Sequence, residues 1–74
     1  MKKNIFITGG AGYVGSKLVP KLLNLGHKVT VLDLMIYGEV VLNDHPNLKK
    51  VKGDIRDINL LKKFLPGHNI LIHL

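Results

Sequence analysis

The chain has 74 residues, contains no cysteine and carries a formal net charge of +6 at pH 7. This length limits it to one small domain, and the absence of cysteine excludes disulfides and thiolate metal sites. Its lysines are dispersed, without the arginine-rich run or aromatic stacking surface of nucleic-acid-binding proteins. We therefore predict that it binds no nucleic acid and that its charge attracts small anionic ligands.

The N-terminal segment begins Met1-Lys2-Lys3 and continues with the apolar run Ile5-Phe6-Ile7. This run ends at Thr8 and is too short for the core of a signal peptide. No stretch of the sequence approaches the ~20 apolar residues of a membrane span. The sequence predicts a soluble, cytoplasmic protein without a membrane partner.

Short segments rich in β-branched residues predict the strands. Three of them stand out, at Asn4–Thr8, Lys28–Asp33 and Ile70–Leu74, and a weaker one lies around Lys50–Lys52. The first and last contain continuous apolar runs, which are typical of strands that are covered on both faces.

The first predicted helix runs from about Tyr13 to Leu25, and Gly26 is a suitable stop. Its apolar residues recur at helical spacing. They are Val14, Leu18, Leu22 and Leu25, joined by Val19 and Leu23. Pro20 conflicts with this helix because an interior proline costs about 3 kcal/mol or a kink, but it falls on the polar face.

The second predicted helix runs from about Asp57 to Leu65, with Asp57 as its N-cap. Pro66-Gly67 ends it. Its apolar stripe consists of Leu60, Leu61, Phe64 and Leu65. Between the two helices, a short helix over Glu39–Leu42 is an open alternative to irregular structure.

Strands alternating with helices or connections predict an α/β fold with a parallel sheet and helices on both faces. The expected strand order is 3-2-1-4, the first half of a doubly wound sheet. The last strand would then be an exposed apolar edge, which natural domains avoid. We therefore expect residues 1–74 to be the N-terminal part of a longer protein, and the isolated chain to fold poorly or aggregate.

A glycine-rich segment, Thr8 to Gly15, lies between the first strand and the first helix. Backbone N–H groups at such a turn and the helix dipole can hold a dinucleotide's pyrophosphate. The glycines fit two patterns, Gly10-x-Gly12-x-x-Gly15 and Gly9-x-x-Gly12-x-x-Gly15. The segment also resembles a phosphate-binding P-loop, but that motif requires Lys before Ser, and the order here is Ser16-Lys17.

Asp33 lies 18 residues after Gly15, at the expected end of the second strand. A carboxylate at this position accepts hydrogen bonds from the hydroxyls of an adenosine ribose. It would repel a 2′-phosphate, and the three residues that follow include no arginine to hold one. The pattern therefore favours NAD over NADP as the cofactor.

Three segments together resemble the extended short-chain dehydrogenase/reductase family, which contains the NAD-dependent sugar-nucleotide epimerases and dehydratases. They are Thr8–Ser16, Gly53–Asp57 and His68–Leu74, and they occur in the family's order over nearly the whole chain. The resemblance implies the N-terminal half of a Rossmann-type sheet. It also implies that the pair Tyr13 and Lys17, although spaced like the family's catalytic pair, is not catalytic, because that pair lies far downstream.

The resemblance implies roles for nine residues. Gly9, Gly12 and Gly15 would form the pyrophosphate turn, and Tyr13 and Val14 would present backbone N–H groups to the phosphates.

The other four would hold the adenosine. Asp33, with Leu34 beside it, would bind the ribose. Asp54 would accept a hydrogen bond from the adenine amino group, and the Ile55 backbone would border the ring. We assign no catalytic residue and no metal ligand, and we interpret the four histidines as structural, with His73 in the sheet near the cofactor.

The resemblance implies that this chain binds NAD as part of a sugar-nucleotide epimerase or dehydratase that acts on a small nucleotide-sugar substrate and forms a homodimer. The Tyr/Lys pair that performs the family's chemistry would lie outside this chain. Two alternatives stay open: a non-catalytic NAD-binding regulatory module, and a flavin-binding protein that uses Gly10-x-Gly12-x-x-Gly15.

Overall fold

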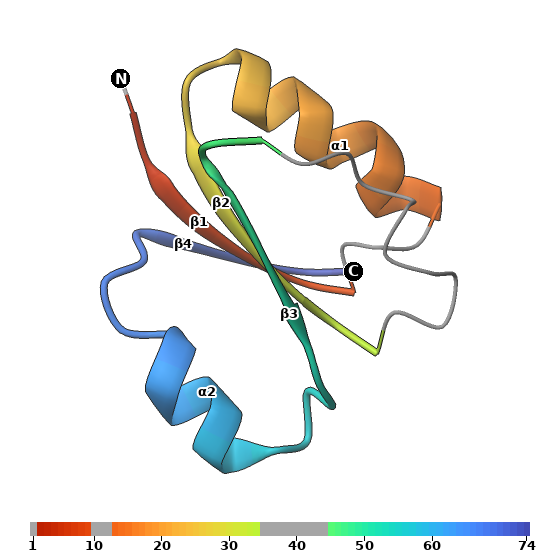
Figure 1. Cartoon of the computed structure of the whole chain (residues 1–74), viewed down its shortest axis with the longest axis vertical. Coiled ribbons are helices and arrows are strands. Elements are labelled where there is room, and N and C mark those ends of the chain that lie inside the picture. The colour runs from red at the N-terminus through yellow and green to blue at the C-terminus, as the bar shows by residue number, and fades with distance from the viewer. Residues whose placement is uncertain (1, 10–12, 35–44) are drawn as a thin grey trace.

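The computed structural model describes residues 2–9, 13–34 and 45–74. They form a four-stranded, all-parallel sheet with one helix on each face (Figure 1). The elements in chain order are β1 (Asn4–Thr8), α1 (Tyr13–Asn24), β2 (Lys28–Asp33), β3 (Leu48–Lys52), α2 (Ile58–Phe64) and β4 (Ile70–His73). The strand order is β3-β2-β1-β4, which confirms the predicted order and the doubly wound fold class.

The predicted bounds of β1 and β2 are confirmed, and the other elements differ by one or two residues. β3 begins at Leu48, two residues before the predicted start. Its Lys-rich sequence pairs with β2 along its whole length, from Leu48 opposite Val29 to Lys52 opposite Asp33. The segment 39–42, for which a short helix was an alternative to irregular structure, lies outside the described residues.

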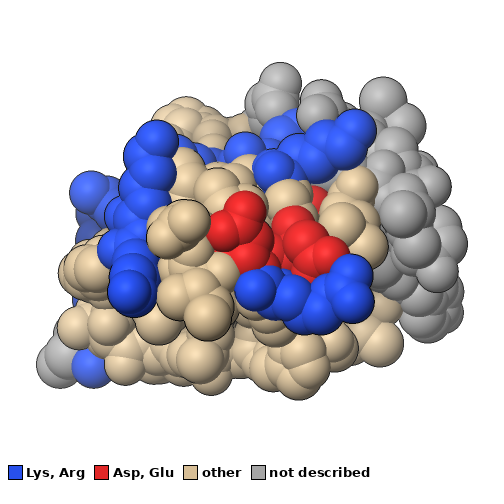
Figure 2. All heavy atoms as spheres, turned by 90° about the horizontal axis from the view of Figure 1, so that it is seen from below, with Lys and Arg blue, Asp and Glu red and all other residues tan. Residues whose placement is uncertain are grey.

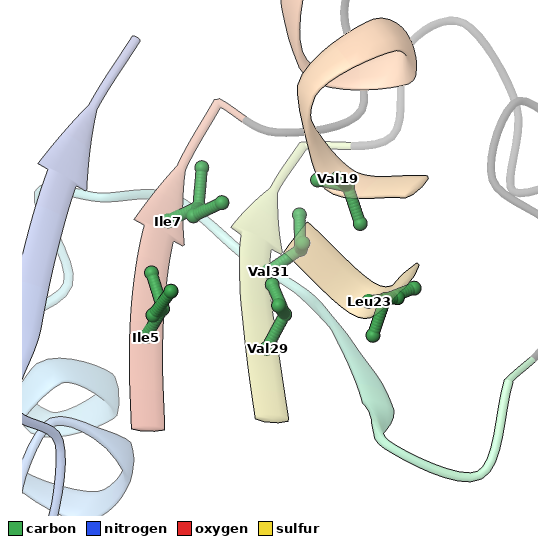
Figure 3. Packing of buried hydrophobic residues seen from close by; sticks show 6 residues of the cluster. All are labelled: Ile5, Ile7, Val19, Leu23, Val29 and Val31. Atoms are coloured by element: carbon green, nitrogen blue, oxygen red, sulfur yellow. The ribbon is translucent and has the colours of Figure 1, made fainter. Parts of the chain in front are cut away.

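The first core lies between α1 and the sheet (Figure 3). Alternate residues of β1 and β2 point to this side, since successive side chains of a strand face opposite ways. They meet two residues of α1. The cluster consists of Ile5, Ile7, Val29, Val31, Val19 and Leu23.

The predicted apolar stripe of α1 is only partly right. Val19 and Leu23 are buried, but Val14 and Leu25 are 58% and 69% exposed. Gly15, four residues before Val19, is also buried, and Leu22 packs against the same core. Pro20 is exposed, as expected.

α1 ends one residue earlier than predicted, in a Schellman motif. Gly26 has φ +91°, its N–H donates to Leu23 O at 3.0 Å, and the His27 N–H donates to Leu22 O at 3.2 Å. This arrangement satisfies the last carbonyls of the helix and requires a left-handed residue at Gly26.

The second core lies on the opposite face, beneath α2. The sheet contributes Phe6, Leu32 and Val51, and the helix packs the whole predicted stripe against them. Asp57 is the N-cap, with its carboxylate accepting from the N–H groups of Asn59 and Leu60 at 3.0 and 3.2 Å, so this prediction is confirmed.

His68 connects α2 to the sheet. Its Nδ1 lies 2.9 Å from Leu65 O at the helix end, and its Nε2 lies 3.0 Å from Thr30 Oγ1 on β2. The ring also makes an edge-on contact with Phe6, with the centroids 5.2 Å apart. The His68 ring therefore holds the turn between α2 and β4 against the second core.

Among the residues described, no helix is long and apolar enough to cross a membrane.

Candidate functional site

The carboxyl ends of all four strands lie at one edge of the sheet, and a cavity of about 270 Å³ opens there. Every strand except β3 contributes its final residue, and the segments after β1, β2, β3 and β4 complete the lining. The lining residues are Thr8, Gly9, Leu32, Asp33, Leu34, Gly53, Asp54, Ile55, His73 and Leu74. Ligands of open α/β sheets bind at this edge.

The structure brings five of the nine predicted cofactor residues together in this cavity. They are Gly9, Asp33, Leu34, Asp54 and Ile55. They come from three segments that are distant in the sequence, and the parallel pairing of the strands brings these segments to the same edge of the sheet.

Of the remaining four predicted residues, Val14 and Gly15 are not among those that line the cavity. Tyr13, Val14 and Gly15 form the first turn of α1, and Gly15 is buried. Gly12 lies outside the described residues. The structure therefore gathers the residues assigned to adenosine, and it places three of those assigned to pyrophosphate at the N-terminus of a helix.

Gly9 turns the chain away from β1. Its φ is +76°, a left-handed conformation that favours glycine. Its N–H donates to Leu32 O at 2.9 Å, and a Cβ added to it would lie 3.0 Å from Leu74 O. Glycine is thus required here both by the backbone angle and by the close approach of the chain after β4.

Asp33 is the last residue of β2 and stands opposite Lys52 in register. The Gly53 N–H donates to the Asp33 backbone carbonyl at 2.9 Å, so the backbone of Asp33 is fixed by β3. Its half-buried side chain lines the cavity. A carboxylate held in this way can accept hydrogen bonds from two neighbouring hydroxyl groups.

Asp54 forms an ion pair with Arg56 that the sequence analysis did not predict. Arg56 Nη2 donates to Oδ2 at 2.6 Å, Nε lies 3.1 Å from both oxygens, and the Arg56 backbone N–H donates to Oδ1 at 2.8 Å. These hydrogen bonds, the side-chain ones first, lower the pKa of Asp54 from its ordinary value of 3.8 to about 2. The carboxylate is therefore ionised and acts only as an acceptor at neutral pH.

Figure 2 views the molecule from the side where β3 leads into α2. Acidic side chains lie near the middle of this face, with lysine and arginine side chains around them. Leu34 and Ile55, which follow Asp33 and Asp54 in the sequence and also line the cavity, are 51% and 39% exposed. The cavity thus offers acceptors for hydroxyl and amino groups next to apolar surface for a flat ring.

Thr8 and His73 were not among the predicted site residues, yet both line the cavity. Thr8 Oγ1 lies 2.6 Å from His73 Nδ1. The signal that could have found this pair is the register of β1 with β4, in which Thr8 stands opposite His73.

The other three histidines have local partners. The Lys3 N–H donates to His27 Nδ1 and the Asn47 N–H to His45 Nδ1, each at 3.0 Å, and His68 holds the end of α2. Within residues 2–9, 13–34 and 45–74, no cluster of three or more His, Cys, Asp or Glu side chains could hold a metal ion.

Comparison with known proteins places these features in a family. Residues 5–74 match the model of the NAD dependent epimerase/dehydratase family. The chain is 39% identical, over 93% of its length, to dTDP-glucose 4,6-dehydratase of Streptomyces niveus. It is 37% identical, over 92% of its length, to UDP-glucose 4-epimerase of Neisseria meningitidis serogroup A.

Among solved structures, the enzyme WbmH of Bordetella bronchiseptica in complex with NAD⁺ superposes with a TM-score of 0.91 at 35% identity. That superposition covers 100% of this chain and 26% of WbmH. The chain likewise spans only 24% of the Streptomyces dehydratase and 22% of the Neisseria epimerase. The match of the family model over residues 5–74 shows that this chain belongs to the NAD dependent epimerase/dehydratase family.

Proposed function

We propose that this chain binds NAD, with the adenosine half of the cofactor in the cavity at the carboxyl edge of the sheet. The observation that carries the proposal is that five residues predicted from the sequence, four of them assigned to adenosine, lie together in that cavity. The cavity volume of about 270 Å³ is near the lower end of the range for ligand pockets, which suits part of a dinucleotide better than the whole.

The chemistry of the lining fits an adenosine. Asp33 would accept hydrogen bonds from the ribose hydroxyls, with Leu34 beside the sugar. Asp54, which is ionised at neutral pH and paired with Arg56, would accept from the adenine amino group, and the Ile55 backbone would border the ring. Both carboxylates are acceptors, and both groups of the ligand are donors.

The phosphates would lie at the glycine turn. Gly9, Gly12 and Gly15 would allow close approach of the backbone, and the N–H groups of Tyr13 and Val14 would donate to phosphate oxygens at the positive end of the α1 dipole. When bound, NAD would supply hydride transfer: its oxidised form accepts a hydride and its reduced form donates one. The residues of this chain bind and orient the cofactor, and we assign none of them a catalytic role.

We further propose that the chain is the NAD-binding part of a larger cytoplasmic, homodimeric enzyme that epimerises or dehydrates a nucleotide sugar. The proposal is supported by family membership and by relatives named for UDP-glucose and dTDP-glucose. The substrate-binding and catalytic residues would lie outside residues 1–74. Conversion of UDP-glucose or dTDP-glucose by the protein at its natural length, followed by chromatography of the sugar product, tests this part.

Calorimetric titration tests the cofactor directly. We expect NAD to bind, NADP to bind at least tenfold more weakly because Asp33 repels its 2′-phosphate, and FAD not to bind. Equal affinity for NAD and NADP would contradict the role of Asp33, and binding of FAD in place of NAD would favour the flavin alternative.

A further inference from the structure

The ends of β1 and β4 are joined through side chains as well as through the backbone. The Leu74 N–H donates to the Thr8 carbonyl at 2.9 Å, and Thr8 Oγ1 lies 2.6 Å from His73 Nδ1. Thr8 is 2% exposed, whereas His73 is exposed toward the cavity that both residues line. A buried hydroxyl is costly without a hydrogen bond, so His73 satisfies a group that burial would otherwise penalise.

This connection lies directly at the start of the glycine turn. Thr8 precedes Gly9, whose N–H is held by Leu32 O on the β2 side. On the β4 side, the position of a Cβ on Gly9 would be 3.0 Å from Leu74 O. Gly9, at the start of the turn, therefore lies close to both neighbouring segments, and the Thr8–His73 hydrogen bond adds a side-chain contact between the residue before it and β4.

The Thr8–His73 hydrogen bond joins the last register pair of β1 and β4, at the point where the cavity wall meets the glycine turn.

We propose that His73 is a positioning residue for the cofactor, which rests on the proposed NAD function. Through its hydrogen bond with Thr8, His73 fixes the start of the glycine turn and so the backbone that receives the pyrophosphate. It acts through Thr8 and does not itself contact the reacting atoms. The role accordingly predicts a selective effect on ligands that carry the diphosphate.

The test compares NAD, ADP and adenosine as calorimetric probes of the protein at its natural length. His73→Phe removes the ring nitrogen, and Thr8→Val removes the hydroxyl with little change of shape. His73→Asn places a side-chain oxygen near the position of Nδ1, and the matched control His73→Gln places it near Nε2.

We expect His73→Phe, His73→Gln and Thr8→Val each to weaken NAD and ADP binding by about three- to tenfold, the value of one hydrogen bond. Adenosine binding should weaken less than ADP binding, and His73→Asn should retain the parent affinities. The double variant Thr8→Val/His73→Phe should be no weaker than either single variant, because both remove the same bond.

Each contrary outcome identifies what is wrong. Failure of the parent protein to bind NAD overturns both the proposed function and this inference. With NAD binding intact, an equal loss for ADP and adenosine shows a general structural role and overturns the positioning role alone. A neutral Thr8→Val beside a weakened His73→Phe also overturns it, since His73 would then contact the ligand directly.

Discussion

Replacing Gly9 with alanine tests whether the glycine turn is fixed by the chain after β4. Gly67 provides a matched control, because both residues have left-handed φ angles, +76° at Gly9 and +89° at Gly67. A Cβ at Gly67 would meet nothing within 4 Å, whereas a Cβ at Gly9 would lie 3.0 Å from the backbone oxygen of Leu74.

The left-handed conformation costs an alanine ~1–2 kcal/mol at either position. At Gly9 the contact with a backbone atom adds about 1–3 kcal/mol, because the end of β4 must move to relieve it. We therefore expect Gly67→Ala to lower the free energy of unfolding by about 1–2 kcal/mol and Gly9→Ala by about 2–5 kcal/mol. Only the Gly9 variant should also weaken NAD binding.

Urea unfolding followed by circular dichroism measures the two free energies, and calorimetric titration measures NAD affinity. Equal destabilisation by the two variants would show that the approach of Leu74 to Gly9 has no energetic consequence. Unchanged NAD affinity of a folded Gly9→Ala protein would refute the assignment of this turn to the pyrophosphate.

Three further predictions concern single side chains. Asp33→Ala should weaken NAD binding by roughly 1–3 kcal/mol, one or two hydrogen bonds to a charged group, while Asp33→Asn should reduce the preference for NAD over NADP; calorimetric affinities unchanged in both variants would exclude the ribose role. His68→Ala should lower the free energy of unfolding by about 2–4 kcal/mol, because it removes two hydrogen bonds and an aromatic contact. Thr30→Val removes only one of those hydrogen bonds and should lower it by about 0.5–1.5 kcal/mol. Equal losses of free energy in urea unfolding would contradict these separate contributions. The pKa of Asp54 falls from 3.8 to about 2 in the folded protein, so its ion pair stabilises the fold above about pH 4, and this contribution is lost as the pH falls toward 2. The difference in the free energy of unfolding between the parent and Asp54→Asn should therefore shrink over that interval. A constant difference would argue against the pairing with Arg56.

The fold was predictable where local patterns and burial agree. The β-branched residues of β1 and β2 predicted the bounds of these strands, both faces of which are covered, and the Asp57 cap predicted the start of α2. The apolar face of α1 was only partly predicted. Helical spacing alone cannot distinguish a side chain that points to the sheet from an apolar residue beside it, such as Val14.

The candidate site was predicted at the level of segments, and its side-chain contacts were not. Strand order and parallel orientation bring Asp33 and Asp54 to one cavity, and both were predicted from the alternation of strands and helices. The pairing of Asp54 with Arg56 depends on side-chain rotamers within a turn. The pairing of Thr8 with His73 depends on a register between residues 65 positions apart. The cofactor roles of all these residues stay predictions until a ligand is measured.

The central place of β1 has a consequence for how the chain acquires its structure during synthesis. β1 is made first, but its partners begin 24 residues later on one side and about 65 residues later on the other. Until residues 70–73 leave the ribosome, the backbone groups on one edge of β1 have no strand to bind. Long-range parallel pairing of this kind forms slowly and leaves an apolar edge exposed meanwhile. We therefore expect the nascent chain to be prone to aggregation in the interval between completion of β2 and emergence of β4.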